Sequence, residues 1–335
     1  MSVNVGMWVK ALQVIPRITR EEWEKLDVIS RWLISTRAAV LIMTFTSATI
    51  GGLLAARDGM FNLGLWFLTV LGLVLAHALN NLLNDLTDYE RGIDENNYFR
   101  AQYGPHPLQQ GLMTRKQLLT YAAVTGALAL AAGLYLVLLR GWLALVLLVL
   151  GAFFVFFYTY PLKYIGLGEV AVLLVWGPLM IGGSYFVITG EWSWMAVLAG
   201  LPYALGPTTV IYGKHIDKLD ADRQKGVRTL PVIIGEKAAR VSVRVMIVLM
   251  YALVAGLVLV GYFTPAMLIV FFALRYLPET WKMLGSPRPS APPEERKDIW
   301  PLWFVAANFY HNRAYGMLFL LGLIADVILR NTLLK

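Results

Sequence analysis

The sequence contains repeated blocks of about 20 mostly apolar residues, the length that an α-helix needs to cross the hydrocarbon core of a bilayer. Clear examples occupy residues 38–56, 63–83, 118–139 and 143–160. Because a backbone in lipid must satisfy its own hydrogen bonds, such blocks predict membrane-spanning helices. Composition agrees, since only 15% of the 335 residues are charged, against about 25% in ordinary soluble domains. The first block begins near residue 37, behind a charged segment, which argues against a cleavable signal peptide.

The pattern predicts an all-α, polytopic membrane protein with about nine transmembrane helices. The predicted spans cover roughly residues 37–56, 62–83, 116–138, 142–160, 167–188, 194–213, 240–260, 264–282 and 312–330. With this topology, only Arg57, Arg140, Arg330 and Lys335 fall on one side, and the other 25 of the 29 lysines and arginines fall on the opposite side. Cytoplasmic loops carry the positive excess. We therefore expect a multi-pass protein of the cell (plasma) membrane whose N-terminus and long loops are cytoplasmic.

The charge and the metal-binding residue types narrow the function classes. The net charge of +8 follows membrane topology, so it indicates contact with membrane lipid and anionic groups and argues against nucleic acid. The chain has no cysteines, which excludes disulfides and thiolate chemistry. Its four histidines are scattered, which makes a histidine-rich zinc site a poor interpretation.

Two regions are predicted along the chain. Residues 1–36 form a cytosolic or interfacial amphipathic segment, in which Thr19 and Glu22 have the spacing of a capping box. Behind it, Trp23, Leu26 and Trp32 recur at helical spacing, which predicts one helix in the membrane interface. A plain anchor with no part in chemistry is the simpler interpretation. Residues 37–335 form a single transmembrane domain of two pseudo-halves, whose motif loops, 84–115 and 214–239, each begin with carboxylates.

The first acidic motif continues the second predicted span. If the helix persists, His77, Asn81, Asn84 and Asp88 lie on one face. Polar residues on one stripe of an apolar helix normally face a cavity, because lipid cannot satisfy them. Further carboxylates stand at Asp85, Glu90 and Asp94.

The second acidic motif follows the sixth predicted span and mixes both charges. Its carboxylates are Asp217, Asp220 and Asp222, and its cations are Lys214, Lys218, Arg223, Lys225 and Arg228. Magnesium is usually held by one or two carboxylates together with substrate phosphate, and nearby cations neutralise the remaining phosphate charge. Two such loops at equivalent positions favour binding of metal and phosphate over a merely solvated surface, although spacing alone does not identify the ligand.

These motifs resemble those of the UbiA family of membrane prenyltransferases, and the resemblance runs from about Arg37 to Val260. The resembling segments are Asn84-Asp85-Leu-Thr-Asp88 with Gly92-Ile-Asp94, Tyr158-Thr-Tyr-Pro-Leu-Lys163, and Asp222-Arg223 with Gly226-Val-Arg228-Thr229-Leu230-Pro231. Together with Gly177-Pro178 and Thr189-Gly190, they look closest to the branch that prenylates 1,4-dihydroxy-2-naphthoate for menaquinone biosynthesis. Single segments are weak signals, whereas the ordered set is highly specific.

The resemblance implies a fold, a reaction and a set of roles. It implies helices around a central cavity with a cytosolic cap, and transfer of a polyprenyl group from an isoprenyl diphosphate to a small, hydrophobic or aromatic acceptor with Mg²⁺ as cofactor. The implied metal ligands are Asn84, Asp85, Asp88, Asp94 and Asp222, with Asp217 and Asp220 as further candidates. The implied substrate contacts are Arg37, Asn84, Lys163, Lys214, Arg223 and Arg228, with Tyr158 near the reacting carbon.

Two positions depart from the family pattern. The family usually has an aspartate four residues before the position of Asp222, where this chain has Lys218. Asp217 and Asp220 flank that lysine and, being three apart, are expected to share a helix face. Either they supply the missing ligand or the second metal is held differently. After the first motif, His106-Pro107 stands where family members often have Arg-Pro. These changes leave the acceptor and the metal arrangement open.

Two rival functions follow from the same residues. A membrane terpene cyclase would use the same scaffold but quench the carbocation within the prenyl chain, and the altered second motif is compatible with it. A cation transporter would use the acidic clusters as ion sites. Transporters place such residues near the bilayer midplane, whereas these motifs lie at the ends of helices, which argues against transport.

Overall fold

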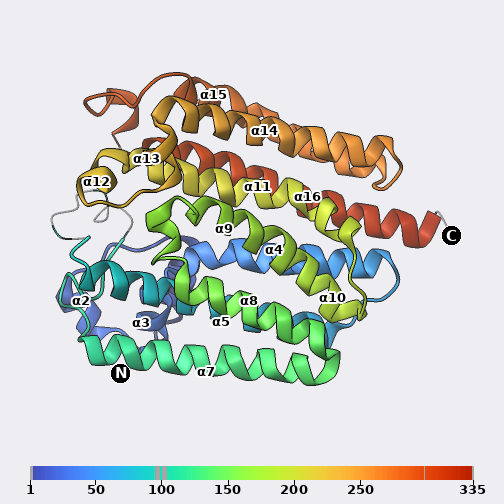
Figure 1. Ribbon diagram of the computed structural model, residues 1–335, viewed down its shortest axis with the longest axis horizontal. Helices are drawn as coiled ribbons and strands as arrows, with labels where there is room; N and C mark the ends of the chain where they lie inside the picture. The colour runs from blue at the N-terminus through green and yellow to red at the C-terminus, as the bar shows by residue number, and fades with distance from the viewer. Residues whose placement is uncertain (1–2, 94, 96–98, 100–103, 298, 334–335) are drawn as a thin grey trace.

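Long apolar helices lie side by side and run between two ends of the molecule (Figure 1). The computed structural model describes residues 3–93, 95, 99, 104–297 and 299–333, and all regular structure in this part of the chain is helical. Seven helices have the length and apolarity to cross a membrane. They are α4 (Ala38–Arg57), α5 (Leu63–Glu90), α7 (Arg115–Arg140), the continuous run Gly168–Thr189, α11 (Trp194–Asp217), α14 (Glu236–Leu259) and α16 (Trp303–Leu333). The predicted all-α class is confirmed.

The expected count of nine spans is not confirmed. The fourth expected span is α8 (Trp142–Phe157), whose 16 residues extend about 24 Å, less than the hydrocarbon core of about 30 Å. The expected span 264–282 is divided between a 3₁₀ helix, η3 (Pro265–Tyr276), and α15 (Leu277–Gly285). Pro278 stands in the first turn of α15, where its missing N–H is tolerated, and it favours the start of a new helix there.

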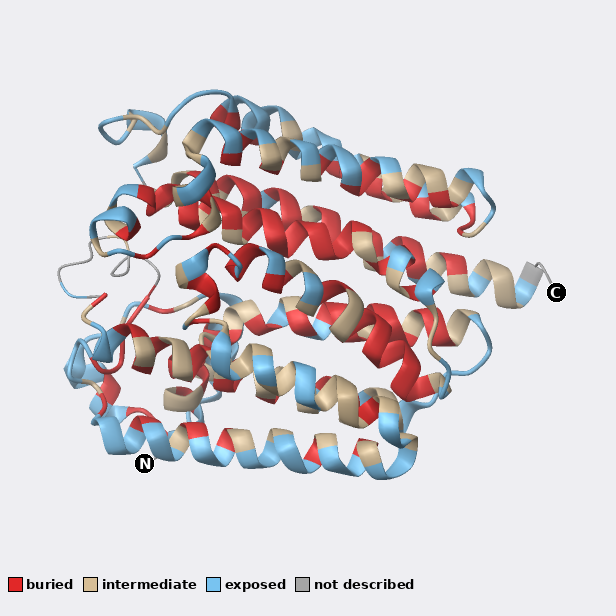
Figure 2. Cartoon of the chain, viewed as in Figure 1, coloured by how far each residue is buried: buried red, intermediate tan, exposed pale blue. Residues whose placement is uncertain are grey.

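The span Gly168–Thr189 changes its winding in the middle. It consists of α9 (Gly168–Leu174), a π-helical segment η2 (Val175–Gly182) and α10 (Gly183–Thr189). Pro178 lies inside η2 and cannot donate the usual backbone hydrogen bond, which accounts for the irregular turn. Figure 2 shows this span and α11 largely buried, while α7 is exposed along its outer face.

The shorter elements gather at the end of the molecule that carries the motif loops. In chain order they are α1 (Val5–Gln13), α2 (Arg20–Lys25), α3 (Val28–Ser35), η1 (Leu162–Ile165), α12 (Leu219–Gln224), α13 (Leu230–Ile234) and η4 (Glu294–Arg296). The capping box is confirmed, since Thr19 and Glu22 exchange both hydrogen bonds. The prediction of a single interfacial helix is wrong, because α2 ends at Lys25 and Asp27 caps a second helix, α3. Trp23 and Leu26 are buried in a core cluster with α5 and α7, so this segment packs on the domain.

Asp27 holds the N-terminal helices together. Its carboxylate accepts from the backbone N–H and hydroxyl of Ser30, the indole of Trp8 and the backbone N–H of Asn4, at 2.7–3.1 Å. Burial acts to raise the pKa of Asp27, but these hydrogen bonds outweigh it and hold the pKa well below its usual value. A depressed carboxyl pKa stabilises the fold above the unfolded pKa of about 3.9, and this contribution is lost as pH falls through the folded value.

We therefore expect Asp27→Ala to detach α1 from the rest of the protein. Tryptic cleavage after Lys10 and Arg17 should become at least about tenfold faster, because a loss of about 1.4 kcal/mol makes the population of molecules with α1 detached about ten times larger. Timed proteolysis of the purified protein in detergent measures this. Glu24→Ala removes an exposed carboxylate from the same segment and serves as the control. Equal cleavage rates in both variants would contradict the role of Asp27.

At the end of the molecule opposite the motif loops, a buried ion cluster joins several helices. Asp326, fully buried on α16, lies 3.3 Å from Arg57 Nε at the end of α4 and 3.8 Å from Arg330 Nε. Its other oxygen accepts from the backbone N–H of Thr264 at 2.5 Å, and Arg57 also donates to the carbonyl of Tyr262 at 2.6 Å. The cluster therefore ties α4, α16 and the α14–η3 turn together.

Candidate active site

A cavity of about 1120 Å³ lies among α4, α5, α7, α8, η2, α11 and α16. Most of its wall is apolar, and α7 and α8 contribute many glycines and alanines. Most of its ionisable side chains come from the helix ends at the motif loops, whereas His77 lies in the middle of α5, and Tyr310 and Arg313 lie further along α16. In the described chain the ionisable side chains of the wall are Arg37, His77, Asp88, Tyr158, Lys163, Lys214, His215, Lys218, Asp222, Tyr310 and Arg313. The cavity is therefore charged at one end and apolar along its length.

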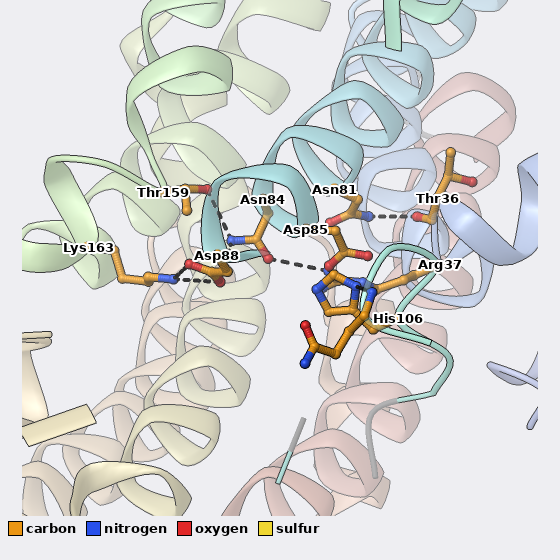
Figure 3. A network of polar contacts seen from close by, with 10 residues as sticks. Thr36, Arg37, Asn81, Asn84, Asp85, Asp88, His106, Thr159 and Lys163 are labelled. Carbon is orange, nitrogen blue, oxygen red and sulfur yellow. Dashed lines mark hydrogen bonds and ion pairs between the residues drawn. The ribbon is translucent and has the colours of Figure 1, made fainter. Parts of the chain in front are cut away.

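The polar stripe predicted on α5 is confirmed. The helix runs unbroken to Glu90, and His77, Asn81, Asn84 and Asp88 all line the cavity. Asn84 donates to Asp88 Oδ2 at 3.3 Å and to Thr159 Oγ1 at 3.1 Å, as Figure 3 shows. The stripe ends in a carboxylate at the charged end of the cavity.

The turn after α8 places Lys163 against Asp88. Its Nζ lies 2.8 and 2.9 Å from the two Asp88 oxygens, and both side chains are buried (Figure 3). The backbone N–H of Lys163 donates to the carbonyl of Tyr158 at 3.0 Å, which closes the turn. Tyr158 and Lys163 both line the cavity, so this segment faces the first acidic motif as the sequence indicated.

Arg37 reaches the same stripe from the start of α4. It has left-handed backbone angles, φ 54° and ψ 53°, an uncommon conformation for a residue other than glycine. Its guanidinium forms an ion pair with Asp85 and donates to Asn84 Oδ1 at 3.3 Å (Figure 3). Asp85 is 1% exposed and absent from the cavity wall, so the structure pairs this predicted metal ligand with Arg37.

The second motif presents Asp222 to the cavity together with two lysines. Asp222 Oδ1 lies 3.5 Å from Lys218 Nζ, and both side chains are buried. Lys214 lines the cavity one turn earlier, within electrostatic range of Lys163, Lys218 and Asp88.

The expectation that Asp217 and Asp220 share a helix face is wrong, because α11 ends at Asp217 and α12 begins at Leu219. Asp217 caps α16 instead: its two oxygens accept from the backbone N–H groups of Phe304 and Val305, each at 3.0 Å. Asp220 is exposed beside Arg223, with an oxygen–nitrogen distance of 3.5 Å. Neither carboxylate lines the cavity.

Three other predicted residues lie away from the cavity or outside the described chain. Arg223 and Arg228 are exposed and absent from the cavity wall. Asp94 lies outside the described residues.

The two motif loops contact each other directly. Lys225, behind α12, donates from Nζ to the backbone carbonyls of Gly92, Ile93 and Glu95 at 2.6–2.8 Å. Segments about 130 residues apart are therefore in direct contact at the end of the molecule that carries the motif loops. A buried pair, His215 Nδ1 and Glu169 Oε1 at 2.6 Å, joins α11 to α9 beside them.

Comparison with known proteins identifies the family. The chain matches the UbiA prenyltransferase family over residues 44–295. It belongs to this family. The protein is accordingly a membrane prenyltransferase, in agreement with the resemblance of its motifs.

Curated relatives of this UbiA-family chain are distant but extensive. It is 24% identical to 1,4-dihydroxy-2-naphthoate octaprenyltransferase of Bacillus subtilis, over 71% of this chain and 77% of that protein. It is 29% identical to the Escherichia coli enzyme of the same name, over 62% and 70%. A Drosophila melanogaster UbiA prenyltransferase domain-containing protein 1 homolog is 25% identical, and the chain spans 63% of that protein's length.

Solved structures share the fold. A UbiA homolog from Archaeoglobus fulgidus bound to GPP and Mg²⁺ superimposes with a TM-score of 0.58 at 17% identity, over 88% of this chain and 99% of that chain. A digeranylgeranylglyceryl phosphate synthase gives a TM-score of 0.56 at 17% identity, over 89% and 96%.

The residues of this UbiA-family cavity fit a magnesium ion that arrives with its substrate. No three histidine or acidic side chains among the described residues are grouped to hold a metal by themselves. Asp88 and Asp222, however, enter one cavity from separate motifs, surrounded by cations. Magnesium takes one or two carboxylates plus phosphate oxygens, so this donor set suits it.

The predicted substrate contacts omitted two parts of the cavity wall. Lys218 lines it, although the sequence analysis named this residue only among the cations of the second motif and as the position of a lost aspartate; its spacing of four from Asp222 was the available signal. Gln13, Val14 and Ile15, behind α1, also line the cavity, so the N-terminal segment is more than a remote anchor. Nothing in their sequence pattern predicts this contact.

Proposed function

We propose that this chain transfers a polyprenyl group from an isoprenyl diphosphate to a small aromatic acceptor of the quinone-precursor type, with Mg²⁺ as cofactor. The observation that carries the proposal is the division of one cavity into a charged end and a long apolar part. A prenyl diphosphate has the same division, a strongly anionic head and a hydrocarbon tail. The 1,4-dihydroxy-2-naphthoate octaprenyltransferases among the relatives support the choice of acceptor class.

The charged end would bind the diphosphate as a leaving group. Lys163 and Lys214 aim ammonium groups at the place where negative charge grows as the bond to the allylic carbon breaks, which lowers the barrier electrostatically. Magnesium, held by Asp88 with Asn84 at this end of the cavity, would supply further Lewis-acid stabilisation of that charge. Tyr158, which follows the last residue of α8 and lines the cavity, would stabilise the carbocation through its ring face. The apolar wall excludes water until the acceptor carbon captures the cation.

The charged end is proposed to face the cytoplasm. Arg57, Arg140 and Arg330 lie at the other end, and each guanidinium is bound to backbone carbonyls or to Asp326 there. The positive excess lies at the motif loops, and such an excess marks the cytoplasmic side. Cysteines introduced singly at Lys237 and Gly141, one near each end, would be labelled from opposite sides of sealed membrane vesicles. Labelling of both from one side contradicts this topology.

The proposed activity is tested with the purified protein, Mg²⁺ and prenyl diphosphates of graded length, each with and without 1,4-dihydroxy-2-naphthoate. A prenylated acceptor identified by mass spectrometry supports the proposal. A cyclic terpene formed without acceptor assigns a terpene cyclase instead. Ion flux into proteoliposomes with no turnover of prenyl diphosphate would contradict both.

Tail length gives a further prediction. Gly151 lines the cavity on α8, and a Cβ added there meets no atom within 4 Å, so a larger side chain would project into open space. We expect Gly151→Phe to shift the preference toward shorter prenyl diphosphates, with the kcat/KM for the longest chain reduced about 100-fold through lost tail burial.

The matched control for tail length is Gly256→Phe. Gly256 lies on α14 outside the cavity wall and also has open space at its Cβ. Its chain-length profile should equal that of the unmodified protein. An unchanged profile for Gly151→Phe would show that the tail occupies another path.

A further inference from the structure

The cavity holds an unusual balance of charge. Its wall in the described chain contains five lysines and arginines but only two carboxylates, Asp88 and Asp222. Because Asp85 pairs with Arg37 behind the wall, the excess is two positive charges, against the roughly three negative charges of a diphosphate ester. Each carboxylate already has a lysine beside it, Lys163 for Asp88 and Lys218 for Asp222. Every divalent ion added to this end increases the positive excess further.

The two acidic motifs differ in the ligands that they present to a metal ion. Asp88 lies in the last turn of α5, where the helix dipole favours a cation, and the amide of Asn84 stands beside it. Asp222 has no comparable neighbour, because Asp217 caps α16 and Asp220 is on the surface. Within the described residues, the second motif therefore brings one carboxylate to the cavity, with an ammonium 3.5 Å from it.

Lys218 is well placed to keep its charge. It follows the last residue of α11, where the negative end of the helix dipole favours a cation. Its side chain is 8% exposed and lines the cavity, so the ammonium points to the substrate space and not to solvent. The distance to Asp222 is longer than the 2.8 Å of the Lys163–Asp88 pair, which leaves donors for a further acceptor.

We propose that Lys218 is a diphosphate-binding residue that takes the place of a second metal ion, so that the site holds one divalent cation, on the Asp88 side. This inference rests on the proposed function and specifies how the second motif binds the leaving group. Lys218 donates to a phosphate oxygen, and Asp222 holds the ammonium in position. One divalent ion enters with the substrate beside Asp88 and Asn84.

The test counts metal ions bound to the full-length protein in detergent. Mn²⁺ replaces Mg²⁺, inorganic pyrophosphate serves as the probe, and bound Mn²⁺ is measured by electron paramagnetic resonance after dialysis. We expect one Mn²⁺ per chain in the presence of pyrophosphate for the unmodified protein. Lys218→Asp, which restores a carboxylate four residues before Asp222, is expected to bind two.

Charge-removing and charge-keeping variants test the contact itself. Lys218→Gln should still bind one Mn²⁺ but weaken pyrophosphate binding about tenfold, because a charge-assisted hydrogen bond is lost. Lys218→Arg should restore affinity to within about threefold. Lys282→Gln removes an exposed lysine outside the cavity and should change neither quantity. If Lys218→Asp does not fold, these variants still decide whether Lys218 contacts pyrophosphate.

The outcomes separate this inference from the proposed function. Two Mn²⁺ per unmodified chain overturn the single-metal site and leave prenyl transfer intact. Pyrophosphate affinity unchanged in Lys218→Gln overturns the contact. Failure of the unmodified protein to bind pyrophosphate with Mn²⁺ at all overturns the inference and the proposed function together.

Discussion

Asp88→Ala is expected to abolish prenyl transfer, with kcat reduced at least about 10³-fold, the scale seen when one group that stabilises developing charge is removed. The variant loses the carboxylate proposed to hold the metal and leaves the Lys163 ammonium, 9% exposed, without its partner. Turnover is measured by product formation at saturating prenyl diphosphate. Asp88→Asn keeps the side-chain shape and should be nearly as inactive, which would attribute the loss to charge.

Folding must be shown to survive in the Asp88 variants. Size-exclusion chromatography and thermal unfolding in detergent should give profiles close to those of the unmodified protein. Glu294→Ala removes a carboxylate on η4 whose side chain is 87% exposed, and it provides the matched control with unchanged turnover. Turnover of Asp88→Ala within threefold of normal would remove Asp88 from the site.

Asp326→Ala is expected to be the most destabilising single change, with the free energy of unfolding lowered by about 3–5 kcal/mol. Asp326 is fully buried, and its removal leaves the guanidinium of Arg57, which is 6% exposed, with only the partly exposed carboxylate of Asp58 at 4.0 Å. It also leaves the N–H of Thr264 without an acceptor. Thermal and chemical unfolding in detergent measure the loss.

A double variant distinguishes a stranded charge from lost packing. Replacing a buried ion pair by apolar residues of similar size is often neutral, so Arg57→Met with Asp326→Leu should recover most of the stability. Double-variant stability no better than that of Asp326→Ala would contradict the ion-pair explanation. Enzyme activity of the double variant should be near normal, because the cluster lies at the end away from the motif loops.

Local patterns predicted much of the bundle and part of the site. Apolar blocks of bilayer length located the long helices, and helical spacing placed Asn84 and Asp88 on the cavity wall. The same periodicity does not separate Asp85 from that stripe, because Asp85 stands four residues after Asn81 and three before Asp88. Its absence from the wall accompanies its ion pair with Arg37, which the sequence did not predict.

Contacts between distant segments could not be predicted from local sequence patterns. The sequence predicts Asp217 as a candidate metal ligand because it stands in an acidic motif. In the structure it caps a helix that begins 86 residues later, at Trp303. The break of α11 at that residue depends on this tertiary contact as much as on local sequence. Similarly, the approach of Ile15 to the cavity depends on how α1 packs, which Asp27 fixes from another helix.

The ion cluster around Asp326 has a mechanical consequence. It joins α4 and α16 at one end of the bundle, so a tilt of either helix would pivot about that end. The 20 residues of α4 make a lever of about 30 Å, and each degree of tilt moves its other tip by about half an ångström. Arg37 lies at that end of α4, and Asp217 caps the corresponding end of α16. A tilt of either helix about the cluster would therefore displace the end near the proposed leaving-group site most, and the Arg37–Asp85 ion pair and the Asp217 cap are the contacts that restrain it there.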